Sequence, residues 1–179
     1  MQASDPVQST AIALRSVLME LRQVIARLDA SIYSAATSTQ PAGTIGAHVR
    51  HILDHVTAVS GALNEDQTLI CYDRRRRGSA IEHDRQAALV GLDDLISNLE
   101  NTTADLPDRS VQVEHMLSGA GDTVRMPSYL SRELYFVMHH TIHHNAMIAT
   151  RMRARGLAIP MGFGLAPATL NFVASNQAN

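Results

Sequence analysis

The sequence lacks lysine and tryptophan, and its 179 residues include one cysteine, Cys71. The absence of lysine excludes Schiff-base catalysis. A single cysteine excludes an internal disulfide and a zinc finger, and it is typical of the reducing cytoplasm, where we expect the protein to act. No apolar run approaches the roughly 18 residues of a membrane span. Residues 1–9 contain no basic and then apolar leader, so we expect no signal peptide and no membrane partner.

The sequence also has no large excess of charge of one sign, since it contains 15 basic and 17 acidic residues. Nothing in this balance favours nucleic acid or a membrane surface as a partner. A small-molecule substrate is expected from the candidate site described below. Aromatic residues make up 4% of the chain, and the apolar set is mainly Ala, Leu, Val, Ile and Met. This composition favours packed helices. The length is that of one domain, residues 1–179.

Apolar residues recur at steps of three and four in four segments, which predicts four amphipathic helices. These helices span Val7–Ala36, Thr44–Leu63, Ser79–Asn101 and Ser128–Arg155. We therefore predict an all-α protein, a four-helix bundle with a long crossover between the second and third helices.

The connecting segments carry weaker signals. The crossover from Asn64 to Gly78 reads as a polar loop, and Ser79 and Glu82 have the spacing of a capping box. Alternating residues within Thr102–Arg125 indicate a short β-hairpin before the last long helix. A short final helix is expected near Ala168–Val173.

Seven of the nine histidines fall in two clusters on predicted helices. They are His48, His51 and His55 in one helix, and His139, His140, His143 and His144 in the other. Residues three, four or seven apart share a helix face, and an i,i+4 pair can chelate one metal ion. One such pair with one histidine from the other helix would give a site with three imidazoles and an open position.

Neighbouring residues on a helix point about 100° apart, so His139/His143 and His140/His144 cannot both face inward. The spacing alone also leaves open that the histidines are surface or core residues without a metal. Neither helix contains Glu-x-x-His, which argues against a carboxylate-bridged di-iron site.

The run from Asp73 to Arg77 could bind an anionic group of a substrate, with Arg75 and Arg77 as the candidates, or it could be a solvated loop. Tyr72 could donate a hydrogen bond to a bound ligand. Arg50 projects away from His51, and we expect it to pair with an acidic residue. His55 is a candidate base beside the metal.

The stretch from Thr44 to His55 (TIGAHVRHILDH), with HTIHH at residues 140–144 some 85 residues later, resembles the DinB/YfiT-like metalloenzyme family. CYDRRRR at residues 71–77 and FGLAPAT at residues 163–169 are similar to one uncharacterised branch. The resemblance covers most of the chain. It implies an up-down-down-up four-helix bundle with a metal, often zinc or nickel, held by His51, His140 and His144.

The same resemblance implies an activity, since characterised relatives include S-transferases that use bacillithiol or mycothiol. We therefore expect a metal-dependent enzyme, either a transferase that uses a low-molecular-weight thiol or a hydrolase. The alternatives are a non-catalytic metal-binding or stress-response protein, for which a fourth protein ligand such as His48 or His55 would argue, and a bundle that binds metal adventitiously. Oligomeric state stays open, with the first helix and the apolar tail available for a homodimer.

Overall fold

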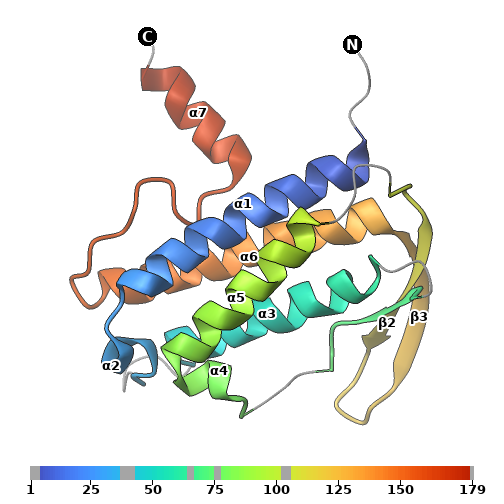
Figure 1. Cartoon of the computed structure of the whole chain (residues 1–179), viewed down its shortest axis with the longest axis horizontal. Coiled ribbons are helices and arrows are strands. Elements are labelled where there is room, and N and C mark those ends of the chain that lie inside the picture. The colour runs from blue at the N-terminus through green and yellow to red at the C-terminus, as the bar shows by residue number, and fades with distance from the viewer. Residues whose placement is uncertain (1–4, 37–42, 64–66, 75–77, 102–105, 178–179) are drawn as a thin grey trace.

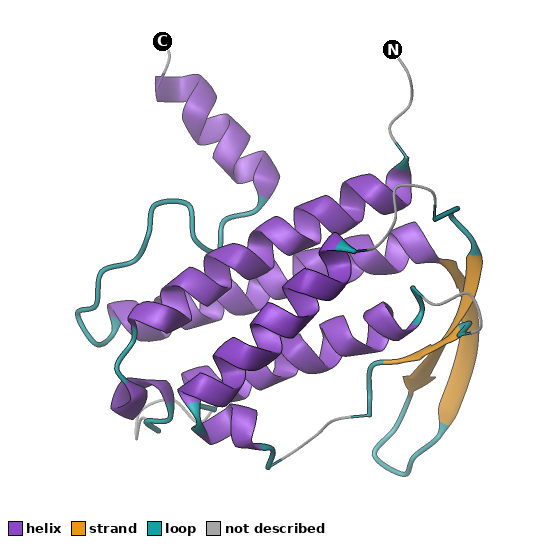
Figure 2. Ribbon diagram, viewed as in Figure 1, coloured by secondary structure: helices purple, strands orange, loops and turns teal. Residues whose placement is uncertain are grey.

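The computed structural model describes residues 5–36, 43–63, 67–74, 78–101 and 106–177. The described chain is mainly helical, with a small sheet at one end (Figures 1 and 2). The helices are α1 (Pro6–Arg27), α2 (Ala30–Tyr33), α3 (Ile45–Gly61), α4 (Ala80–His83), α5 (Arg85–Glu100), α6 (Leu130–Arg153) and α7 (Pro167–Gln177). The strands are β1 (Leu69–Cys71), β2 (Ser110–Met116) and β3 (Thr123–Tyr129).

The four long helices lie side by side around a common core (Figure 1). Helix α1 packs against α5 and α6, and α3 packs against the same two helices. Fully buried aliphatic side chains from all four helices meet there, among them Leu18, Ile52, Leu92 and Leu134. Because these residues recur at helical spacing, each helix contributes one apolar stripe. The packing fixes α3 against α6, the two helices that carry the histidine clusters.

Local hydrogen bonds explain where the helices begin and end. The side chain of Asp5 caps α1, and that of Thr44 caps α3 by accepting from the backbone N–H of Ala47. Helix α1 ends at Arg27, whereas the sequence pattern predicted one helix to Ala36. Leu28 is extended there, and Arg85 donates to the carbonyl oxygens of Ala26 and Leu28, so the chain turns into α2.

The predicted helix over Ser79–Asn101 is divided at Asp84, whose extended backbone separates α4 from α5. The predicted capping box is wrong, because the Ser79 side chain makes no cap hydrogen bond. The Glu82 carboxylate instead lies 3.0 Å from Nε of Arg50. Arg50 also pairs with Asp54 at 2.7 Å. The expectation that Arg50 pairs with an acid is therefore confirmed, and this pairing ties α4 to α3.

The predicted hairpin is confirmed as β2 and β3, which pair antiparallel with Val113 opposite Met126. It reaches Tyr129, so α6 begins at Leu130, two residues later than predicted. The polar crossover contains strand β1, which the sequence pattern did not predict. It pairs parallel to β2, with Ile70 opposite Val113, and gives the sheet order β1-β2-β3. The sheet covers the end of α6 that precedes the histidines.

The last helix, α7, begins at Pro167 and is longer than the predicted Ala168–Val173 segment. Figure 1 shows it projecting away from the other helices, and its residues 167–176 are exposed. Among the described residues, no helix combines the length and the apolar character that crossing a lipid bilayer requires.

Candidate metal centre

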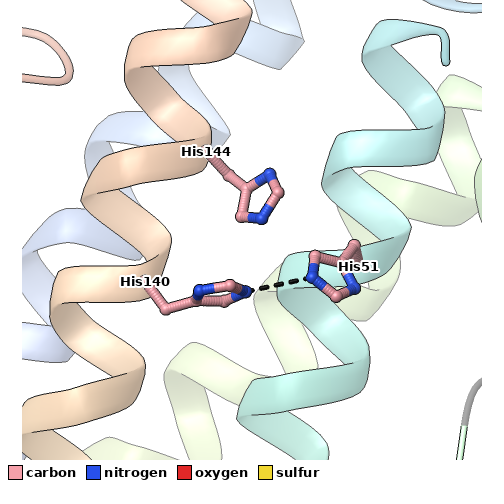
Figure 3. A group of neighbouring side chains, drawn as sticks. All are labelled: His51, His140 and His144. Carbon is pink, nitrogen blue, oxygen red and sulfur yellow. Dashed lines mark hydrogen bonds between the residues drawn. The ribbon is translucent and has the colours of Figure 1, made fainter. Parts of the chain in front are cut away.

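Three histidines from two helices converge between α3 and α6 (Figure 3). His51 comes from α3, and His140 and His144 come from consecutive turns of α6. The Nε2 atoms of His51 and His140 lie 3.0 Å apart. One ring nitrogen from each of the three residues lies within 4.8 Å of the other two. This is the set of side chains that the family resemblance implied.

The other members of the α6 cluster face elsewhere. His143 is exposed, and the ring of His139 packs on Tyr135 with 4.4 Å between the centroids. The argument that only one i,i+4 pair can face inward therefore holds, and the inward pair is His140/His144.

The donor atoms suit a first-row divalent ion. Zinc–imidazole bonds of about 2.0–2.1 Å at tetrahedral angles separate two ligand nitrogens by roughly 3.3 Å, and the His51–His140 separation of 3.0 Å is close to that value. Among the described residues, the group comprises these three side chains and no fourth His, Cys, Asp or Glu. Three imidazoles could thus hold a metal ion and leave a coordination position open.

His48 contacts His144 and lies outside the group of three histidines. Its Nδ1 lies 3.0 Å from Nδ1 of His144, and Nε of Arg151 donates to its Nε2 at 3.1 Å. Because His48 contacts the Nδ1 side of His144, it does not join the group around His51 and His140. All three of His48, His144 and Arg151 are buried.

His55 lies against two of the three histidines. Its ring stacks on His140 with centroids 4.3 Å apart, and it meets the ring of His51 edge-on at 4.3 Å. Its Nδ1 is 3.1 Å from the backbone oxygen of His51. A carbonyl oxygen only accepts, so Nδ1 carries the proton and Nε2 is left as an acceptor. This tautomer suits the predicted role of His55 as a base, which stays a prediction.

Tyr72 does not point its hydroxyl at the three histidines. The hydroxyl donates to Oε2 of buried Glu133 at 2.8 Å, while the ring stacks on His55 with centroids 5.1 Å apart. Burial raises the pKa of Tyr72 well above its ordinary value, and the charge of Glu133 and this hydrogen bond raise it further. Tyr72 is therefore a neutral donor that links the residue after β1 to α6.

Glu133 is a site residue that the sequence reasoning missed. Its carboxylate also accepts from Oγ of Ser128 at 2.6 Å and from Nη1 of Arg132 at 2.8 Å. The available signal was its position seven residues before His140, which places both on one face of the helix. Arg132 is its neighbour on α6, whereas Tyr72 directly follows β1 and Ser128 belongs to β3, so the approach of these two depends on the sheet.

The predicted anion-binding residues Arg75 and Arg77 lie outside the described residues. Arg74 is described and, with Cys71 and Asp54, lines a cavity of about 550 Å³ between α3 and β1. None of the three converging histidines lines that cavity.

Burial, and after it the charges of His140, His51, His48 and His143, lower the pKa of His144 to about 3. His144 is therefore neutral at neutral pH, which is the protonation state that a metal ligand requires.

Comparison with known proteins gives two matches. The sequence profile of the DinB family matches residues 13–167. FK506-binding protein 5 of Rhizopus delemar (strain RA 99-880) is 32% identical over 111 residues, which are 59% of this chain and 28% of that protein. The chain therefore spans less than a third of the length of this relative. No solved structure matches the chain.

Proposed function

Since this chain belongs to the DinB family, we propose that it is a metal-dependent enzyme whose divalent ion is bound by His51, His140 and His144. The observation that carries the proposal is the convergence of three imidazole nitrogens within 4.8 Å of one another. Zinc and nickel are the proposed ions, because imidazole suits both.

We further propose that α1, α3, α5 and α6 form a four-helix bundle of the DinB/YfiT type, in which the connection from α3 to α5 is the crossover. The pairwise packing of these four helices supports this assignment. In such a bundle, a metal site is built from side chains on facing helices. Here the facing helices are α3 and α6.

A divalent ion held by three imidazoles supplies a Lewis acid that lowers the pKa of a coordinated water or thiol. The surrounding residues have defined tasks. His55 presents an unprotonated Nε2 that can take a proton from a reacting group. The ring of Tyr72 stacks on that of His55, and Glu133 holds Tyr72 by accepting from its hydroxyl. The proposed reactions are transfer of a low-molecular-weight thiol to an electrophile, or hydrolysis.

The open coordination position favours an enzyme over a non-catalytic metal-binding protein. A storage or sensor site would be better served by a fourth protein ligand. His48, one of the two candidates for that role, contacts the far nitrogen of His144 and Arg151 instead.

The test is the metal content of protein produced without a His tag. His140→Ala removes one of three ligands, so we expect its metal content to fall from near one equivalent to near zero. The matched control is His143→Ala, which removes an exposed imidazole one turn away on the same helix and should keep the metal. Circular dichroism should show the same helix content for both variants. Retention of one equivalent by His140→Ala would contradict the assignment of the three ligands.

A further inference from the structure

A small cavity lies between the β2–β3 hairpin and the first turns of α6. Its volume is about 260 Å³, just below the roughly 300–1,000 Å³ typical of sites for drug-sized ligands. The lining residues come from β2, β3 and α6, and they include His115, Met126, Ser128, Arg132, Glu133 and Phe136. The walls are partly apolar and partly charged, which suits a small amphipathic molecule.

The negative charge in this cavity is already compensated. Glu133 is 1% exposed, and its carboxylate accepts from Tyr72, Ser128 and Arg132 at 2.6–2.8 Å. A carboxylate held by three donors, one of them charged, has little to gain from a cationic ligand. The cavity is therefore poorly suited to an amine.

Arg132 supplies positive charge that can still meet a ligand. Its pair with Glu133 uses Nη1 alone, whereas a guanidinium carries five N–H donors on three nitrogens. Its side chain is 63% exposed, and its central carbon lies 5.4 Å above the ring of Phe136. His115 lines the same cavity, and an imidazole has an N–H donor in either tautomer. This arrangement suits a planar anion attached to an apolar body.

The cavity adjoins the candidate metal centre through Phe136. The ring of Phe136 stacks on that of His140, with centroids 5.7 Å apart and 22° between the planes. It also packs against Tyr72, with centroids 5.3 Å apart. Arg132, Phe136 and His140 follow each other at steps of four along α6, so they share one face of the helix. A molecule held by Arg132 thus lies next to Phe136, whose ring separates it from His140.

We propose that this cavity binds a small apolar carboxylate, with the carboxylate on Arg132 and the apolar body against Phe136 and Met126. The claim that such a molecule is the substrate rests on the proposed function, whereas the claim that it binds does not. Binding is therefore measured on metal-stripped protein. The metal content of His140→Ala then tests the proposed function, and carboxylate binding by metal-stripped protein tests the cavity. Either result can fail without the other.

The probe is benzoate, with benzamide as its neutral isostere, and binding is followed by calorimetry and by protein NMR shifts. Wild-type protein should bind benzoate at least tenfold more tightly than benzamide. Arg132→Gln should weaken benzoate binding about tenfold to 100-fold, which is the range for losing a charge-assisted hydrogen-bonded pair, and should leave benzamide unchanged. Arg153→Gln, an exposed arginine at the other end of α6, is the matched control and should bind like wild type.

Arg132→Gln also removes a hydrogen-bond donor to Glu133, which could disturb the cavity by itself, so a second variant tests the cavity without this change. Met126→Trp leaves every charge in place and fills the cavity from the half-exposed side of β3, so it should abolish benzoate binding. Equal affinity for benzoate and benzamide would overturn the proposal, as would unchanged benzoate binding in folded Arg132→Gln or Met126→Trp.

Discussion

Arg151 donates a hydrogen bond from Nε to Nε2 of His48 at 3.1 Å, between α6 and α3. A guanidinium only donates, so Nε2 of His48 accepts and a neutral His48 carries its proton on Nδ1. That Nδ1 lies 3.0 Å from Nδ1 of His144, which must accept in turn. The proton of a neutral His144 is thereby placed on its other nitrogen, Nε2, which is the side that faces His51 and His140.

A metal ligand needs a lone pair at the coordinating nitrogen, so the arrangement set by Arg151 competes with coordination by Nε2 of His144. Arg151→Met removes the donor that fixes the His48 tautomer while keeping an unbranched side chain in this buried position. We expect zinc to bind about tenfold more tightly, as one competing hydrogen bond of about 1.4 kcal/mol is lost. Competition with a zinc-binding dye measures the affinity.

The control is a double-mutant cycle with His48→Ala, in which Arg151 no longer reaches His144 through an imidazole. In that background Arg151→Met should leave zinc affinity unchanged. Weaker zinc binding by a folded Arg151→Met protein, or the same gain in both backgrounds, would rule out the coupling.

The low pKa of His144 makes the stability of metal-free protein depend on pH. An unfolded histidine takes up its proton near pH 6.5, whereas folded His144 does so near pH 3. Between these values the unfolded state binds more protons, so the free energy of unfolding falls as the pH falls. Well above pH 6.5, His144 is neutral in both the folded and the unfolded state, so it costs the folded protein no stability there. Urea unfolding of metal-stripped protein at pH 8, 6 and 5 should give successively lower stability.

His144→Gln removes this proton uptake and should flatten the dependence on pH below 6.5. The comparison protein is His83→Gln, which removes an exposed imidazole of α4 that is not among the groups lowering the pKa of His144, and it should keep the wild-type slope. If His144→Gln and wild type lose stability in parallel as the pH falls, the dependence has another origin.

The candidate metal ligands follow from the sequence because their placement depends on local geometry. The i,i+4 spacing of His140 and His144 fixes their common face whatever α6 packs against. The predicted segments also cover the four long helices apart from Pro6, the first residue of α1, since amphipathic periodicity is a strong signal. The family resemblance supplied two choices that spacing left open, that of His51 over His48 and His55, and that of His140/His144 over His139/His143.

Other features of the fold and of the site depend on tertiary structure, and no clear sequence pattern predicts them. Strand β1 has three residues, and its pairing with β2 depends on where the hairpin lies. The break at Asp84 is an exception with a local cause, because the Asp84 side chain caps α5 by accepting from the backbone N–H of Gln86. The contacts of Glu133 with Tyr72 and Ser128 join three elements. Sequence spacing places residues on one element and does not say which elements meet.

Gly46 is required by the close approach of α4 to α3. A Cβ at this position would lie 2.1 Å from the backbone oxygen of Glu82 and 2.8 Å from the ring of Tyr33. Gly46→Ala should therefore lower the free energy of unfolding by about 2 kcal/mol or more, since backbone must move to relieve the overlap. Thermal and urea unfolding measure the loss.

The matched control is Gly91→Ala on α5, where the nearest atoms lie at 3.5 Å or beyond. Alanine is favoured over glycine in a helix by roughly 0.5–1 kcal/mol, so this variant should be as stable as wild type or more so. A Gly46→Ala protein that gains stability like Gly91→Ala would contradict the close packing of α3 and α4.

The hydroxyl of Tyr72 donates to the buried carboxylate of Glu133. We expect its removal to lower the free energy of unfolding and to leave metal binding unchanged. Tyr72→Phe keeps the ring that stacks on His55 and removes the donor to Glu133, a residue that is 1% exposed. A lost hydrogen bond to a buried charge should cost about 1.5–3 kcal/mol of unfolding free energy. Tyr135→Phe, at an exposed tyrosine of α6, should cost close to nothing. Metal content should stay near one equivalent in both variants, because neither hydroxyl faces the three histidines. Loss of metal from Tyr72→Phe without loss of stability would place the hydroxyl at the metal centre, against the hydrogen bond described here.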